Sequence, residues 1–290
     1  LFNQISMSKE EPLVSVVINC YNGERFLKEA IDSVYAQSYQ NWEIIFWDNG
    51  STDNSALIAK SYDERLKYFL SKETTSLGIA RNMAMQKTNG KYITFLDCDD
   101  LHLPEKIAIQ LEAMKTNNTV LSYGSWIEIN AAGSEIKKHK IKSQNSNVFE
   151  QLLYKYNVNF QTLMIDKNFI ESSNICFDTK LVFSPDFMLV MQIAYSNNIS
   201  SIGNYLAQYR VHSDSMSHQY QEEKYNDFKY AMRILGDLGA KDKYLNFNLL
   251  SPAMLYRMKY KDSKKSGKYL IAFINLIRYF VLRLRIAFIK

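Results

Sequence analysis

Apolar runs and amphipathic segments alternate along the first hundred residues of the chain. Four short runs, such as LVSVVIN at 13–19, are apolar almost throughout, which is typical of strands buried on both faces of a sheet. The segments between them repeat apolar residues every three or four positions, which predicts helices. This order predicts an α/β fold, with a mostly parallel central sheet flanked by helices. The predicted strands are 13–19, 42–48, 66–70 and 91–97, and the predicted helices are 24–37, 51–63, 78–88 and 104–115.

The pattern is less regular after residue 118. A long polar stretch, 131–147, reads as a loop, and a final segment, 269–290, is strongly apolar but carries arginines on one helical face. That segment is interrupted by charges, so it suits the surface of a membrane better than its interior. The other predicted strands are 119–130, 159–166 and 205–212, and the other predicted helices are 184–196, 222–238 and 245–259.

The charge of the chain is distributed unevenly. Residues 257–290 hold ten Lys or Arg and one acid, a net charge of +9, whereas the whole chain carries +5, so the rest carries −4. A mildly acidic body argues against a nucleic-acid partner, and the basic tail favours an anionic membrane surface. The three cysteines are far apart and form no CxxC, which indicates neither a disulfide framework nor a zinc site and favours a cytoplasmic protein.

Acidic residues follow two of the predicted strands. Asp48 ends the second strand, and Asp97, Asp99 and Asp100 end the fourth. The carboxyl ends of parallel strands lie at one edge of a sheet, where ligands bind in this class of fold. Neighbouring carboxylates repel one another, and Mg²⁺ or Mn²⁺ relieves that repulsion through oxygen ligands. Since Mg²⁺ in proteins commonly also binds substrate phosphates, the pattern predicts a phosphate-bearing ligand.

Three stretches of the first half resemble the family 2 glycosyltransferases, which have the GT-A fold. They are VSVVINCYNGERFLKEAIDSVYAQSYQNWEIIFWDNGSTDNS, then GIARNMAM, then GKYITFLDCDDLHLPEKI. The resemblance is continuous from about residue 12 to 115 and resumes at FSPDFML and YRVHSDSMS, so it covers roughly two-thirds of the chain. It implies transfer of a sugar from a nucleotide donor, most often a UDP-sugar, to a hydroxyl group of a glycan or a lipid-linked glycan.

The resemblance assigns a donor role to several residues. Tyr21 matches the aromatic residue that packs on the base, Asp48 the acid that hydrogen-bonds the base, and Arg81 an arginine near the nucleotide. Asn19, at the end of the first strand, stands where the family often has Pro, and we group it with the nucleotide-sugar-binding residues.

The DxD motif of the family matches Asp97, Cys98 and Asp99. The resemblance implies that the first acid holds the ribose side and that Asp99 binds Mn²⁺ or Mg²⁺, and we group Cys98 with the nucleotide-sugar-binding residues. His212 matches a histidine that can also bind the metal, and the polar loop after it matches a segment that closes over the diphosphate.

Asp186 matches the catalytic base of the family. A carboxylate opposite the leaving group takes the proton of the acceptor hydroxyl as that hydroxyl attacks, and the anomeric carbon is inverted. The family often has Glu-Asp where this chain has Pro185-Asp186, so the base is kept and the preceding acid is not.

The resemblance and the charge pattern together predict the organisation of the chain. Residues 1–11 form a tail, 12–118 the nucleotide-sugar-binding half and 119–220 the acceptor half of one GT-A domain. Residues 221–290 form a helical, basic, membrane-associating extension, which places the protein at the inner face of the cell membrane. A role in surface polysaccharide or lipopolysaccharide synthesis and a homodimer packed through the last helix are further expectations.

Two other function classes remain as alternatives at this point. A DxD phosphatase also carries two acids after a strand, but its motif belongs on the first strand. A membrane-associated module could bind nucleotide sugars without turnover. A dinucleotide-binding enzyme is disfavoured, because CYNGER after the first strand does not supply the GxGxxG pattern.

Overall fold

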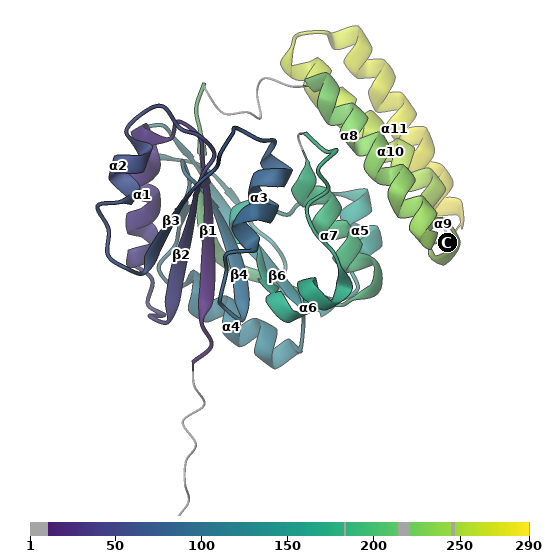
Figure 1. Cartoon of the computed structure of the whole chain (residues 1–290). Helices are drawn as coiled ribbons and strands as arrows, with labels where there is room; N and C mark the ends of the chain where they lie inside the picture. The colour runs from purple at the N-terminus through teal and green to yellow at the C-terminus, as the bar shows by residue number, and fades with distance from the viewer. Residues whose placement is uncertain (1–10, 183, 214–220, 245–246, 290) are drawn as a thin grey trace, which may run out of the picture.

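The structure is a computed structural model, and it describes residues 11–182, 184–213, 221–244 and 247–289. Figure 1 shows a twisted sheet with helices on both faces and a group of C-terminal helices beside it. The sheet order is β3-β2-β1-β4-β9-β6-β10-β5. This architecture confirms the predicted α/β class with a C-terminal helical extension.

The first half of the sheet is parallel, as predicted. Its strands are β1 (Val14–Cys20), β2 (Trp42–Asp48), β3 (Leu66–Leu70) and β4 (Tyr92–Asp97). Alternate residues of β1 enter different cores: Val16 and Ile18 pack with helix α1 (Glu24–Tyr35), and Val17 packs with α3 (Leu77–Met85). Because both faces are covered, the strands are apolar almost throughout.

The second half of the sheet is mixed. β9 (Met164–Asp166) lies antiparallel between β4 and β6 (Leu121–Asn130), and β10 (Ile199–Val211) runs parallel to β6. β5 (Leu101–His102) adds an antiparallel edge. The predicted strand 159–166 is therefore only half a strand, because its first residues form a 3-10 turn, Phe160–Thr162.

Two local expectations were wrong. The stretch 131–147 is not a loop, because β7 (Glu135–His139) forms a hairpin with β6 and β8 (Gln144–Ser146) pairs with β10. β7 is mostly exposed, so its sequence lacks the alternation of apolar and polar residues that predicts a strand. The helix expected at 51–63 shrinks to α2 (Ser55–Ala59), because Ser51 and Asp53 bond to the backbone at Asn22 and Glu24 instead.

The remaining helices surround the second half and extend it. Helices α10 and α11 pack against each other along their length, and α10 also packs against α5 and α8. No helix in the described ranges is both long enough and apolar enough to cross a membrane. These helices are α4 (Lys106–Asn117), α5 (Phe149–Tyr154), α6 (Lys167–Ser173), α7 (Pro185–Ser196), α8 (Gln221–Leu235), a π turn (Gly236–Ala240), α9 (Lys241–Lys243), α10 (Phe247–Lys265) and α11 (Tyr269–Ile289).

Candidate active site

The ends of β1, β2 and β4 bring the predicted donor residues together. In the sheet register Asn19 lies beside Asp97, and Cys20 lies beside Asp48. The side-chain amide nitrogen of Asn19 is buried and has no hydrogen-bond partner among the described residues. A buried donor without a partner is costly, so this atom is a candidate contact for a ligand.

Asp97 is held from two sides. The guanidinium of Arg81, on α3, donates to Oδ1 over 3.1 Å, and the amide of Gln161 donates to Oδ2 over 2.6 Å. The Asp97 backbone N–H donates back to Gln161 Oε1. Arg81 is 3% exposed and lies over the ring of Phe160, with 3.6 Å from Cζ to the ring centroid. The pair is therefore rigid, and it explains how an arginine can be buried here.

Gln161 and Phe160 were not found by sequence reasoning. Both lie in the 3-10 turn that was expected to be strand. A glutamine and a phenylalanine carry no motif, so only the packing of this turn against the end of β4 reveals them.

Asp99 and His212 form a second group. His212 Nε2 and Asp99 Oδ2 are 2.9 Å apart, and the two side chains are 10% and 29% exposed. Burial and the charge of Asp97 raise the pKa of Asp99, and the hydrogen bond from His212 opposes that rise. The carboxylate thus lies where its charge is disfavoured, and a cation beside it would favour the ionised form.

The third acid of the cluster points inward. Asp100 is 1% exposed and accepts the backbone N–H of Arg210 over 2.6 Å. Burial raises the pKa of Asp100 well above its usual range, and the negative charges of Asp99 and Asp97 raise it further. Asp100 therefore supports the loop from inside, and the exposed edge has two acids of the motif where the sequence suggested three.

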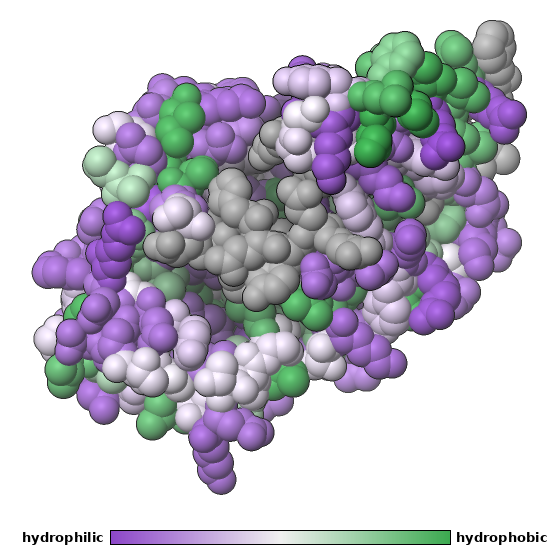
Figure 2. Space-filling model, turned by 90° about the horizontal axis from the view of Figure 1, so that it is seen from above, coloured by the Kyte–Doolittle hydropathy of each residue, from purple (hydrophilic) through white to green (hydrophobic). Residues whose placement is uncertain are grey.

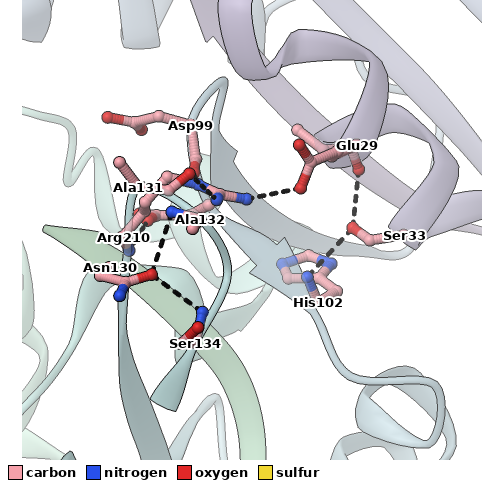
Figure 3. A network of polar contacts seen from close by, with 11 residues as sticks. Glu29, Ser33, Asp99, His102, Asn130, Ala131, Ala132, Ser134 and Arg210 are labelled. Carbon is pink, nitrogen blue, oxygen red and sulfur yellow. Dashed lines mark hydrogen bonds and ion pairs between the residues drawn. The ribbon is translucent and has the colours of Figure 1, made fainter. Parts of the chain in front are cut away.

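Arg210 ties the Asp99 loop to two other elements. Its Nε donates to the carbonyl of Asp99 over 2.9 Å, its Nη1 to the carbonyl of Ala131, and its Nη2 to Glu29 Oε2 over 2.7 Å (Figure 3). The side chain is buried and its guanidinium lies 4.4 Å from the ring centroid of Phe26. Sequence reasoning missed this residue, although it stands two positions before His212 in YRVH. It fixes the end of β10, which His212 directly follows, against the loop that carries Asp99.

Asp48 and Tyr21 lie at the edge with different exposure. Asp48 is 1% exposed and accepts from Tyr68 Oη and from the backbone N–H of Ser51, both over 2.7 Å. Tyr21 is 54% exposed, which is unusual for a large ring in a packed turn. A free aromatic face next to a fixed acid is a suitable surface for a nucleobase.

Cys98 points toward Cys20. The sulfurs of Cys98 and Cys20 both lie under Gly23, so closely that a β-carbon there would lie within 2.8 Å of either sulfur. The side chain of Cys98 therefore packs under the first turn of α1, and Gly23 is the residue that this packing allows.

Asp186 is the second residue of α7, directly after Pro185 at the first helical position. Burial raises the pKa of Asp186, while the positive charge of Arg81 lowers it and the charge of Asp97 raises it. Asp186 therefore lies within electrostatic reach of the Arg81–Asp97 pair. The Tyr156 hydroxyl is 3.5 Å from Asp186 Oδ2, a long contact that sequence reasoning did not anticipate.

The described residues contain no group of three or more His, Cys, Asp or Glu side chains arranged to hold a metal ion. Asp99 and His212 supply one carboxylate and one imidazole side by side. Such a pair fits a divalent ion that takes its other ligands from a bound diphosphate and water. The polar loop expected to close over the diphosphate falls mostly at 214–220, outside the described residues.

Comparisons with known proteins give the family of the chain. The model of glycosyl transferase family 2 matches residues 15–183. The glucosyltransferase WfgD of Escherichia coli, named for UDP-Glc and α-D-GlcNAc-diphosphoundecaprenol, is 28% identical over 89% of this chain and 99% of its own. The putative teichuronic acid biosynthesis glycosyltransferase TuaG of Bacillus subtilis is 31% identical over 56% of this chain and 65% of its own.

Solved structures share the fold. S. aureus TarS in complex with UDP-GlcNAc superimposes with a TM-score of 0.72 at 17% identity, over 93% of this chain and 79% of that one. Some relatives are much longer: an uncharacterized glycosyltransferase of Rickettsia felis is 32% identical over 90% of this chain but only 44% of its own. The phosphatase and binding-module alternatives give way to these matches. The chain belongs to glycosyl transferase family 2.

Proposed function

We propose that this glycosyltransferase moves a sugar from a UDP-sugar to a hydroxyl of a lipid-linked glycan, with inversion and with Mn²⁺ or Mg²⁺. The observation that carries the proposal is the placement of Asp186 within electrostatic reach of Arg81 and Asp97, at the same edge as Asp99 and His212. This edge would therefore combine side chains that bind the donor with a carboxylate that accepts a proton.

The donor side uses the residues at the strand ends. The ring of Tyr21 offers a stacking surface for the base, and Asp48 and Asn19 offer an acceptor and a donor of hydrogen bonds. We assign the fixed Arg81–Asp97 pair to the ribose and the diphosphate of the donor. The backbone of Cys98 follows Asp97 along the same side of the site. Asp99 and His212 would hold the divalent ion, which supplies positive charge for the diphosphate as it leaves.

The acceptor side uses Asp186 as the general base. The proton of the acceptor hydroxyl passes to a carboxylate oxygen of Asp186, while the hydroxyl oxygen bonds to the anomeric carbon. The bond from that carbon to the diphosphate oxygen breaks, and nucleoside diphosphate leaves from the opposite face. A raised pKa makes Asp186 a stronger base, and Tyr156 can donate to the oxygen that does not receive the proton.

The acceptor class follows from the relatives and from the C-terminal helices. WfgD is named for a diphosphoundecaprenol-linked sugar and TuaG for teichuronic acid. In this chain, large apolar residues gather over the C-terminal helices (Figure 2), where Tyr269, Leu270 and Phe273 are each more than half exposed. Together with the +9 charge of residues 257–290, this surface fits an anionic membrane at its inner face. A second copy of the chain is the competing occupant of the apolar face.

The test is transfer itself. The purified chain would be incubated with Mn²⁺, UDP-sugars one at a time, and a short prenyl-diphosphate-linked GlcNAc. We expect product with one UDP-sugar, loss of product with a chelator, and an anomeric configuration opposite to that of the donor in the NMR coupling constants. A retained configuration would remove Asp186 as the base, and transfer unaffected by the chelator would remove the metal.

A further inference from the structure

A group of basic side chains converges beside the acceptor half, from elements that are far apart in the sequence. Lys155 follows α5, Arg257 and Lys261 lie on α10, and Lys137 lies on the β7 hairpin. We call these four residues the basic cluster. Partial burial lowers the pKa of Lys261, and the positive charges of Arg257, Lys224, Lys155 and Lys137 lower it further. These charges are therefore close enough to repel one another.

The contacts of α10 fix this group in place. Arg257 Nη1 donates to the carbonyl of Tyr154 over 3.4 Å, which attaches α10 to the end of α5 immediately before Lys155. Arg257 and Lys261 are four residues apart, so they lie on one face of α10. On the next helix, the guanidinium of Arg283 lies 4.6 Å from the ring centroid of Tyr154. Arg257 is thus held in place by the helix packing, and Lys261 lies one turn further along the same helix.

Some lysines elsewhere in the chain are paired with acids. Lys28, Lys67 and Lys138 each have an acid within salt-bridge distance. Among the described residues, no acid lies within that distance of any member of the basic cluster. Like charges four residues apart on a helix are destabilising. A fold that holds such charges together without acids is suited to an anion that completes the set.

The cluster lies next to the proposed base. Lys155 is in extended conformation between Tyr154, whose carbonyl Arg257 holds, and Tyr156, whose hydroxyl lies near Asp186. A substrate whose hydroxyl reaches Asp186 therefore has a cationic surface one residue away along the chain.

The surroundings of the cluster indicate what carries the anion. Lys261 lies near the end of α10, and the chain then turns into the exposed apolar start of α11, where Leu270 is 73% exposed. Cations beside an apolar surface match a phosphate group attached to a lipid. We propose that Lys137, Lys155, Arg257 and Lys261 form a site for the phosphate of a lipid, and we assign it to the diphosphate of the lipid-linked acceptor. This proposal rests on the proposed function.

The experiment compares two charge-neutralised variants of the full chain. Lys155→Gln with Lys261→Gln removes two charges of the cluster and leaves the Arg257 bond to Tyr154 intact. Lys115→Gln with Lys229→Gln removes two exposed charges elsewhere. The probe is farnesyl diphosphate, titrated in detergent with saturating UDP and Mn²⁺ to fill the donor side, and farnesol serves as the phosphate-free comparison. We expect about tenfold weaker binding of farnesyl diphosphate in the cluster variant only, because each charge adds to the attraction.

A second arm separates the two sources of phosphate. Both variants would be sedimented with phosphatidylcholine vesicles that do or do not contain phosphatidylglycerol. Vesicle binding should fall only slightly in the cluster variant. Equal affinity for farnesyl diphosphate in all three proteins overturns the site, and a loss confined to phosphatidylglycerol vesicles overturns its assignment to the acceptor. If the wild-type chain binds farnesyl diphosphate at the cluster yet transfers no sugar, the site stands and the proposed function fails.

Discussion

The donor edge and the C-terminal extension differ in whether their cations are paired with acids. At the donor edge two buried arginines each have an acid: Arg81 pairs with Asp97, and Arg210 pairs with Glu29. Where the extension meets the acceptor half, Lys155, Arg257 and Lys261 approach one another, and no acid among the described residues lies at salt-bridge distance from them. The first region is also buried and polar, whereas the second borders exposed apolar side chains.

This difference follows from what each region has to hold. An edge rich in carboxylates repels a diphosphate, so it needs an added cation, and Asp99 with His212 offers a place for one. A cationic surface attracts a phosphate directly. Under the proposals made above, a single enzyme would thus bind two diphosphates by two physical means, one dependent on a metal and the other on salt concentration.

The largest expected effect separates chemistry from binding at the donor edge. Asp186→Asn keeps size and polarity but cannot take the proton, so transfer should fall by roughly 100-fold or more while UDP binding is unchanged. In the wild type, transfer should decline as the pH falls through the raised pKa of Asp186, because only the ionised carboxylate accepts a proton. The variant should lose this acid limb. Near-normal turnover of the variant would contradict the assignment.

The second effect contrasts a paired with an unpaired cation. Arg210→Gln leaves Glu29 and two backbone carbonyls without their partner, so the free energy of unfolding should fall by about 2–4 kcal/mol. Lys261→Gln removes only a repelling charge, so stability should stay within about 0.5 kcal/mol or rise. Urea denaturation of both variants measures this. An equal loss in both would mean that the cluster is a structural element.

The third effect tests the metal. Mn²⁺ should strengthen UDP binding in the wild type by at least about tenfold, since an ion between carboxylate and diphosphate replaces repulsion by attraction. In Asp99→Asn most of this gain should disappear, while Asp237→Asn, an exposed acid of the π turn, should behave as the wild type. Calorimetric titration of UDP with Mn²⁺ and with a chelator decides the matter. Identical affinity in both conditions would exclude a metal at the donor edge.

The smallest effect concerns the apolar surface. Leu270→Ser with Phe273→Ser should reduce binding to phosphatidylglycerol vesicles several-fold, because less apolar area enters the interface. The matched control is Leu57→Ser with Leu70→Ser, two exposed leucines of the α/β body. Sedimentation with vesicles measures the binding, and analytical ultracentrifugation shows whether the α11 variant instead dissociates a dimer. A dimer lost in that variant would assign the surface to a second copy of the chain.

The first half of the fold and much of the donor edge could be predicted from the sequence. Buried parallel strands are continuous apolar runs, so β1, β2 and β4 were placed within a residue or two, and their ends brought Asp48, Asp97 and Asp99 into view. The antiparallel strand β9 was overestimated, and the exposed β7 was missed, because a short or solvated strand leaves no periodic signal.

The supporting residues of the site were not predictable in the same way. Gln161, Tyr156 and Arg210 act through partners between 30 and 181 positions away along the chain. Such contacts depend on how the turn at Phe160 and the end of β10 pack against β4, which single-residue patterns do not encode. Asp100 shows the same limit, because its position after the strand suggested an exposed acid, whereas the turn after β4 places it inside, against the backbone of Arg210.

The start of α1 has a consequence for how the chain folds. Its first backbone N–H groups are bonded by the side chains of Ser55 and Asp53, which lie 32 and 29 residues further along the chain. A helix normally finds its cap in its own sequence, and here Gly23 offers none. The first turn of α1 can be completed only after β2 has joined β1 and delivered the loop that follows it. The turn that carries Tyr21 should therefore acquire hydrogen-exchange protection late in refolding, together with the pairing of these strands and after the central turns of the helix.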